Sequence, residues 1–172
     1  MKFAGPRPIA GLVLVLTAVA ALTVTGCSMV SDAAKSDTAR AKVGDCINVP
    51  AGSSADSKTE PVDCASARAV YTVKSTSDKK QDCGNEYTSY EEQFNGGTTA
   101  FLCLAPNLKQ GSCYHDDKTT GFSFAECDST EATVKVVKRI DGQSDEFLCD
   151  AASTFLTLSD PKTTFCLANP KS

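Results

Sequence analysis

Cysteine is the residue type with the most chemistry in this sequence, and nine cysteines occur in 172 residues. Eight of them lie after residue 45, and no two are closer than the ten positions between Cys103 and Cys113. Zinc sites and redox-active thiols use close pairs such as Cys-x-x-Cys, so the spacing disfavours both. Widely spaced cysteines in small secreted domains form disulfides, and we predict that role for these eight.

Two groups of acidic residues offer other chemistry. His115-Asp116-Asp117 has the residue types of a cation site or a general base, but no second cluster completes it, so a polar turn is favoured. The pair Glu91-Glu92 is expected on the solvent face of a helix. A glycosidase needs two converging carboxylates, and the sequence does not show which of 21 acids would converge. We therefore predict no catalytic residue, no metal site and no cofactor.

The composition excludes further classes. One histidine disfavours a Ser/His/Asp hydrolase or a multi-histidine metal enzyme. A formal net charge of −4 without a basic patch disfavours nucleic-acid binding, which needs clustered Lys and Arg. A hydrophobic fraction of 41% is sufficient for a globular core.

The first 27 residues account for the odd cysteine. Lys2 and Arg7 precede the uncharged stretch 9–24, the layout of a secretory signal peptide. The segment Val24-Thr25-Gly26-Cys27 resembles a bacterial lipobox, which implies cleavage before Cys27 and a diacylglyceryl group on its thiol. We predict a lipoprotein signal peptide over 1–26 and anchoring at the extracytoplasmic face of the membrane. The alternative, an uncleaved transmembrane anchor, would have only 18 apolar residues.

The remaining chain is an internal duplication. The cysteines form two sets of four: Cys46, Cys64, Cys83 and Cys103, then Cys113, Cys127, Cys149 and Cys166. Glycine precedes the first cysteine of each set by two positions, and serine follows the second by two. Similar segments surround the fourth: Phe101-Leu102-Cys103-Leu104-Ala105 and Phe165-Cys166-Leu167-Ala168. We predict a flexible linker over 27–42, with a short helix as the alternative, then repeats over 43–106 and 107–172.

Each repeat is expected to be a β-rich α+β unit of antiparallel strands with one short helix. In the first repeat, strands are predicted over 43–49, 61–65, 69–74 and 98–104. A helix is predicted over 86–94, because Tyr87, Tyr90 and Phe94 have helical spacing and Asn95-Gly96-Gly97 would end it. These aromatic residues suit a helix's core face better than a sugar-stacking platform. The second repeat should copy this pattern, with a helical turn near 150–154.

Eight cysteines permit 105 pairings. A duplicated unit should use one scheme twice, which leaves three schemes. We favour first-to-second and third-to-fourth pairing, because the first two cysteines lie on consecutive predicted strands and the last two flank the helical segment. That scheme gives Cys46–Cys64, Cys83–Cys103, Cys113–Cys127 and Cys149–Cys166.

The whole pattern resembles an LppU-like lipoprotein of actinobacteria. The resemblance rests on the lipobox, Val43-Gly44-Asp45-Cys46, Val62-Asp63-Cys64 and the two fourth-cysteine segments. The chain is more distantly similar to septum-formation-type envelope domains, although Ser66 stands where a histidine usually follows the second cysteine. No catalytic residue is implied. We expect a membrane-anchored, non-enzymatic envelope module that binds a protein or glycan partner, the alternatives being a cell-wall hydrolase or a small-ligand or lipid-binding lipoprotein.

Overall fold

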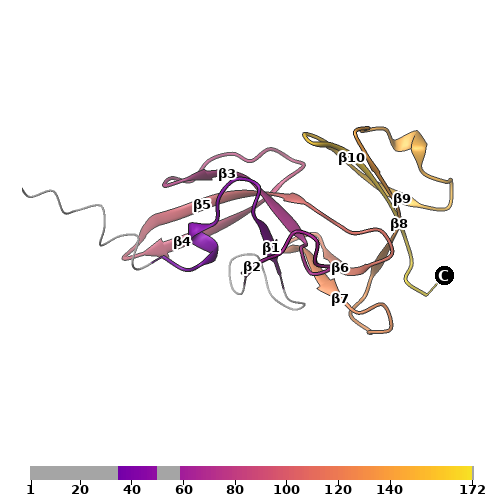
Figure 1. Ribbon diagram of the computed structural model, residues 1–172, viewed down its shortest axis with the longest axis horizontal. Coiled ribbons are helices and arrows are strands. Elements are labelled where there is room, and N and C mark those ends of the chain that lie inside the picture. The colour runs from indigo at the N-terminus through magenta and orange to yellow at the C-terminus, as the bar shows by residue number, and fades with distance from the viewer. Residues whose placement is uncertain (1–34, 50–58, 172) are drawn as a thin grey trace, which may run out of the picture.

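The computed structural model describes residues 35–49 and 59–171, which form two antiparallel five-stranded sheets along the long axis of the molecule (Figure 1). The first sheet has the order β2-β1-β3-β5-β4 and the second the order β7-β6-β8-β10-β9. The first contains β1 (Cys46–Asn48), β2 (Glu60–Val62), β3 (Tyr71–Ser77), β4 (Thr88–Phe94) and β5 (Gly97–Pro106). The second contains β6 (Cys113–Asp117), β7 (Gly121–Ala125), β8 (Val134–Asp141), β9 (Thr154–Ser159) and β10 (Lys162–Ala168).

The helix predicted over 86–94 is wrong: residues 88–94 are strand β4, which forms a hairpin with β5. Asn95 and Gly96 connect the two strands with φ of 51° and 79°. Two positive φ values are what a two-residue type I′ hairpin requires, and Asn-Gly is its preferred sequence. Tyr90 is 7% exposed while Phe94 is 58% exposed, so the aromatic spacing does not form one buried helical face.

The second predicted helix is also wrong. Residues 150–153 form turns and bends that lead into β9. The only helical elements of the described residues are the 3₁₀ turns η1 (Thr38–Arg40) and η2 (Glu146–Leu148). The fold is therefore built mostly of antiparallel β-sheet, without the helix that was expected in each repeat.

The two sheets share backbone details beyond their strand order. Gly44 N donates to Val73 O at 2.9 Å, and at the matching positions Gly111 N donates to Val136 O at 2.8 Å. The register of β3 against β5 shifts between Val73 and Ser75. The register of β8 against β10 shifts by one residue at the matching place, beside Val136. The matching glycine turns and bulges make the two halves structural copies of one unit.

Four disulfide bonds join the pairs that the sequence analysis favours: Cys46–Cys64, Cys83–Cys103, Cys113–Cys127 and Cys149–Cys166. The first bond of each sheet ties the segment after the second strand to the first strand, with Cα atoms 5.1 and 5.0 Å apart. The second bond ties the connection before the fourth strand to the fifth strand, with Cα atoms 5.4 Å apart in both sheets.

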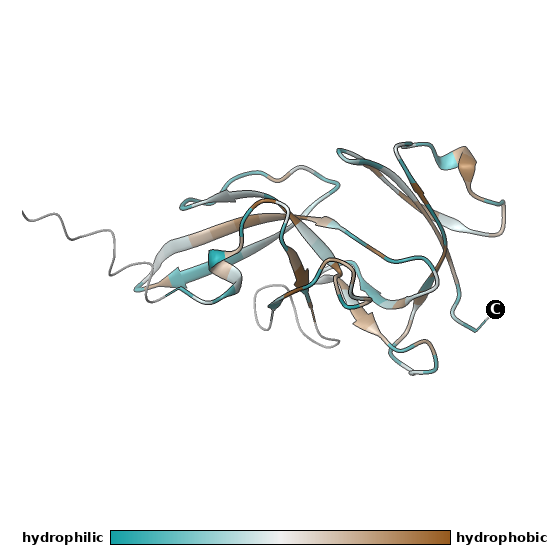
Figure 2. Ribbon diagram, viewed as in Figure 1, coloured by the Kyte–Doolittle hydropathy of each residue, from teal (hydrophilic) through white to brown (hydrophobic). Residues whose placement is uncertain are grey.

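One hydrophobic core serves both sheets. It includes Ile47, Leu104 and Tyr71 from the first sheet and Tyr114 and Phe165 from the second. Figure 2 shows hydrophobic residues concentrated in β1, inside the molecule, and also in the exposed turn η2. Because the core is continuous, we expect the sheets to unfold together.

Direct hydrogen bonds also join the sheets. The Tyr71 hydroxyl accepts the Phe122 N–H at 2.6 Å, and Val49 O accepts the Phe124 N–H at 3.1 Å. Tyr71 is 1% exposed, and burial raises the pKa of its hydroxyl far above the usual range. Position 121 requires glycine for two reasons. A Cβ there would lie 2.6 Å from the Tyr71 hydroxyl oxygen, and the φ of Gly121 is +78°.

Candidate functional site

A groove of about 580 Å³ lies on the first sheet. Its apolar lining comes from Ala39, Ala41, Val43, Ala100 and Leu102, and its polar lining from Lys35, Arg40, Lys42, Thr76, Ser77 and Asp78. This volume falls in the range of small-molecule sites, which combine an apolar lining with a few polar groups.

One wall of the groove is the segment that precedes the first strand. Thr38, Ala39 and Ala41 are buried there, and η1 packs against β5. Ser36 fixes the start of the segment, because its N–H donates to the Glu92 carboxylate at 3.2 Å and its Oγ accepts the Ala39 N–H at 3.1 Å. Residues 35–42, which the sequence analysis assigns to a flexible linker, therefore belong to the folded structure.

The groove carries three cations and one carboxylate. Lys35 Nζ lies 3.5 Å from Asp78 Oδ1, and Arg40 donates to Lys35 O at 2.6 Å and lies 3.5 Å from Asp37 Oδ1. Lys42 adds a third positive charge through its side chain, while its N–H donates to Asp45.

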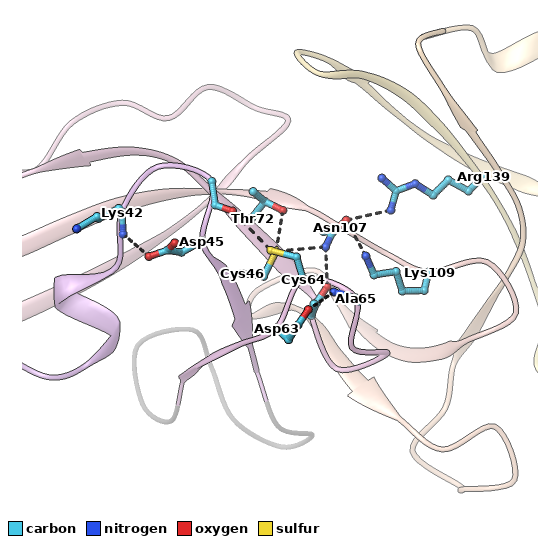
Figure 3. The surroundings of a disulfide bond; sticks show 12 residues. Lys42, Asp45, Cys46, Asp63, Cys64, Ala65, Thr72, Asn107, Lys109 and Arg139 are labelled. Carbon is cyan, nitrogen blue, oxygen red and sulfur yellow. Dashed lines mark hydrogen bonds between the residues drawn. A yellow bond between two sulfur atoms is a disulfide. The ribbon is translucent and has the colours of Figure 1, made fainter.

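In the second sheet, Arg139 occupies the matching space. Its Nη1 donates to Asn107 Oδ1 and to Leu108 O, both at 3.0 Å, and its Nε lies 2.9 Å from Asp141. The guanidinium also lies over the Phe165 ring, 5.4 Å from its centroid. Figure 3 shows Arg139 and Lys109 both directed at Asn107, near the Cys46–Cys64 disulfide.

Lys109 shows how closed this place is. Its Nζ donates to Asn107 Oδ1 at 3.4 Å, the oxygen that Arg139 also uses. Burial, together with the neighbouring Arg139 charge, lowers the pKa of the Lys109 ammonium. Two cations thus converge on one neutral acceptor, Asn107, which is 8% exposed.

The strand registers make the comparison residue by residue. Thr76 pairs with Leu102 across β3 and β5, and Arg139 pairs with Phe165 across β8 and β10. Counting back from Gly44 and Gly111, Arg40 matches Asn107. The first repeat has Thr and Leu where the second has Arg and Phe, so the space that two large side chains fill in one repeat is open in the other.

A second cavity of about 250 Å³ lies between the repeats, lined by Asn48, Arg68, Phe124, Ala125, Glu126, Ser129 and Glu131. Asn48 is 2% exposed; its Nδ2 donates to Glu60 at 2.7 Å, and its Oδ1 has no hydrogen-bond partner among residues 35–49 and 59–171. The Arg68 guanidinium covers the Phe124 ring, 5.6 Å from the centroid. The cavity is less than half the volume of the groove.

The cluster 115–117, predicted as a polar turn, is the end of strand β6, and the turn follows it at 118–120. His115 Nδ1 lies 2.9 Å from Glu131 O, and Asp117 Oδ1 accepts the N–H groups of Thr119 and Thr120 at 2.8 Å. These bonds lower the pKa of the Asp117 carboxyl, whereas burial raises that of Asp116. Over residues 35–49 and 59–171, no three His, Cys, Asp or Glu side chains gather as a metal site would need.

Glu91 and Glu92 are adjacent on strand β4, not on a helix. Neighbouring side chains of a strand point to opposite faces, so the two carboxylates do not converge. Glu91 accepts the Thr98 hydroxyl at 2.6 Å and Glu92 accepts the Ser36 N–H. Cys27, the predicted lipid attachment site, lies outside the described residues.

Sequence reasoning did not find the groove. The signal that was present is the contrast of Thr76 with Arg139 and of Leu102 with Phe165, which appears once the repeats are aligned through the third and fifth strands. Comparison with family models, with curated proteins and with solved structures gives no match. In the part of the chain that the structure describes, no helix has the length and hydrophobicity to cross a membrane.

Proposed function

We propose that this protein is a non-enzymatic binding lipoprotein, anchored through Cys27 at the extracytoplasmic face of the membrane, and that the groove of the first repeat is its binding site. The four disulfides support an oxidising, extracytoplasmic location. The lipobox-like segment that ends at Cys27 supports the anchor.

One observation carries the assignment of the site. The two repeats keep the same strand order, matching disulfides and matching bulges, yet the groove beside the third and fifth strands has Thr76 and Leu102 in the first repeat where the second has Arg139 lying over Phe165. An open space in one of two copies is what a ligand site requires.

A binding role fits the described polar groups better than catalysis. The carboxylates of Glu91 and Glu92 do not converge, His115 Nδ1 lies 2.9 Å from the backbone oxygen of Glu131, and Asp117 accepts backbone N–H groups of the turn that follows it. The groove contributes one carboxylate, Asp78, whose side chain is 86% exposed and lies beside Lys35. An exposed carboxylate beside a lysine does not have the water-excluded surroundings of a catalytic acid.

Photo-crosslinking in intact cells tests the site. A photoreactive amino acid is placed at Ser77, which lines the groove, and in a matched control at Ile140, the equivalent position of the second repeat. We expect a reproducible adduct from position 77 across growth conditions and none from position 140. Equal adducts from both positions, or none from position 77, would contradict the assignment.

The anchor has its own test. Cells labelled with radioactive palmitate should incorporate label into the wild-type chain, and the Cys27→Ser variant should lose it while keeping four intact disulfides. Label that persists in the Cys27→Ser variant would overturn the assignment of Cys27.

A further inference from the structure

We infer that the outer face of the second sheet carries a separate binding surface for a protein partner, whose contacting segment combines apolar side chains with lysine or arginine. This surface, which we call the phenylalanine patch, consists of Phe147 in η2, Phe155 in β9 and Val137 in β8. The inference goes beyond the proposed function, because it concerns the other repeat and does not depend on the groove.

The three side chains of the patch are apolar and are 86%, 49% and 41% exposed, respectively. Phe155 pairs with Cys166 across β9 and β10, and Cys166 pairs with Lys138, the neighbour of Val137 in β8. The Cys149–Cys166 disulfide brings η2 to the same row, and η2 also packs against β9. Single exposed apolar residues are normal on a protein surface, whereas several in one place mark an interaction site.

The first repeat has polar residues at all three matching positions. The distance to the third cysteine and the strand registers identify them as Gln81, Ser89 and Lys74. Gln81 Nε2 donates to Ser75 Oγ at 2.7 Å, and Lys74 Nζ lies 2.8 Å from Asp160 Oδ2. The framework that the repeats share therefore does not require apolar residues at these positions.

Hydrogen bonds fix η2 in the position that exposes its phenylalanine. Asp145 Oδ1 accepts the Phe147 N–H at 3.0 Å, and the Asp145 N–H donates to Thr164 Oγ1 at 3.0 Å. Lys138 Nζ donates to Leu148 O at 3.2 Å. Aromatic side chains are common anchors of protein interfaces. One that is already held in place loses little conformational freedom when a partner covers it.

The charge around the patch selects the partner. Asp145, Glu146 and Asp150 lie within three positions of Phe147, and Lys138 brings one positive charge to the same face. Over residues 35–49 and 59–171, neither Glu146 nor Asp150 forms an ion pair. Complementary charge favours a partner with lysine or arginine beside its apolar residues. A second copy of this chain would bring the same excess of carboxylates, and an anionic membrane would be repelled.

The position of the patch agrees with a partner outside the bilayer. Figure 1 shows η2 and the indigo turn η1 toward opposite ends of the long axis of the molecule. Lys35, beside η1, is eight positions after Cys27, and eight residues extend at most about 29 Å. An anchor at Cys27 would therefore hold the η1 end near the membrane and leave the patch at the remote end.

An NMR titration of the full lipidated chain in a non-ionic detergent tests the inference, with the short peptide Lys-Leu-Lys-Leu-Lys as the probe. One control peptide has glutamate in place of lysine, and the other has serine in place of leucine. We expect the probe to shift the backbone amide signals of residues 146–155, with at least tenfold weaker binding of both control peptides. Equal affinity for either control peptide, or shifts confined to other elements, would overturn the inference.

Matched variants locate the binding. Phe147→Gln with Phe155→Ser installs the first repeat's residues and should weaken probe binding at least tenfold. Glu146→Gln with Asp150→Asn should weaken it about threefold to tenfold and reduce its dependence on salt. Phe94→Ser, which removes a phenylalanine of the first sheet that is 58% exposed, should leave it unchanged. Unchanged binding in the Phe147→Gln, Phe155→Ser chain would refute the patch, provided its mass shows four disulfides.

This inference and the proposed function fail separately. The Phe147→Gln, Phe155→Ser chain should keep the crosslinks from position 77 in cells, and their loss would contradict two separate surfaces. Position 140, the control of that experiment, pairs with Thr164, which is buried beneath the segment 143–145 and lies outside the patch. Binding to phosphatidylglycerol vesicles that this variant abolishes, without binding of the peptide, would assign the patch to the membrane and overturn the inference.

Discussion

The two repeats differ less in their backbones than in two pairs of side chains. Both have glycine turns at matching positions, Gly44 and Gly111, with φ of +95° and +86°, and both have a bulge in the third strand. They diverge where Thr76 faces Leu102 in one and Arg139 faces Phe165 in the other. The two copies thus share the framework that the disulfides hold, but they differ in the side chains beside their third and fifth strands.

The largest expected effect tests the shared framework. Replacing Cys46 and Cys64 by alanine, or Cys113 and Cys127, should each cost about 3 kcal/mol of unfolding free energy, because the loops span 18 and 14 positions. The two losses should agree within a few tenths of a kcal/mol in urea denaturation followed by circular dichroism. If only one of the two cysteine-pair variants lost unfolding free energy, or if unfolding occurred in two separate transitions, the sheets would not share one core.

The next effect tests the joint between the repeats, which is not duplicated, since Val134 stands where the first repeat has Tyr71. Tyr71→Phe leaves the Phe122 N–H without its acceptor and should cost about 1–3 kcal/mol of unfolding free energy.

Gly121→Ala is the companion variant, because its Cβ would collide with the Tyr71 hydroxyl. Its cost should be smaller in the Tyr71→Phe background, where that oxygen is absent. Strictly additive costs in a double-mutant cycle would argue against this contact.

A smaller effect comes from opening the closed copy. Arg139→Thr removes the bonds to Asn107 and Leu108 and the contact with the Phe165 ring, and should cost about 1–2 kcal/mol. Arg139→Lys keeps the positive charge but loses the planar guanidinium and its several donors. The thermal stability of this variant should therefore lie between those of the wild type and Arg139→Thr. A fully stable Arg139→Thr chain would mean that this side chain does not fill the second repeat.

The smallest effect is a pH dependence at the boundary between the sheets. Glu86 accepts the Ser159 N–H at 2.8 Å and its hydroxyl at 2.6 Å, and these bonds lower the pKa of the Glu86 carboxyl. Because the pKa of Glu86 is lower in the folded state, its carboxylate stabilises the fold at neutral pH. This contribution is lost as the pH falls below the unfolded-state pKa of about 4.3.

Glu86→Gln should therefore lower the unfolding free energy by a few tenths of a kcal/mol at pH 7, since this exposed group is screened by solvent. The variant and the wild type should converge in acid when thermal unfolding is followed across pH. A difference that grows toward low pH would have the wrong sign for this mechanism.

The framework was predictable because it depends on local sequence. Cysteine spacing gives the pairing scheme, and repeated Gly and Ser positions around the cysteines mark the duplication. The helix over 86–94 was predicted wrongly because Tyr87, Tyr90 and Phe94 fit a helical period, while the type I′ turn at Asn95-Gly96 requires a hairpin.

The groove was not predictable in the same way. It depends on which side chains face one another across β3 and β5, and strand β4 separates these two strands in the sequence. It also depends on the packing of residues 35–42 against them. Residues 35–42 form a short segment of polar residues and alanine, so their composition alone indicates a flexible linker. Contacts with Tyr90 and Glu92 hold them in place instead.

A reciprocal exchange tests the central claim, that one repeat is open for a ligand and its copy is closed. The full chain would carry Thr76→Arg and Leu102→Phe in the first repeat with Arg139→Thr and Phe165→Leu in the second. Photo-crosslinking in cells would then compare positions 77 and 140. We predict that the adduct is lost from position 77 and that any adduct gained appears at position 140; an undiminished adduct at position 77 would contradict the account.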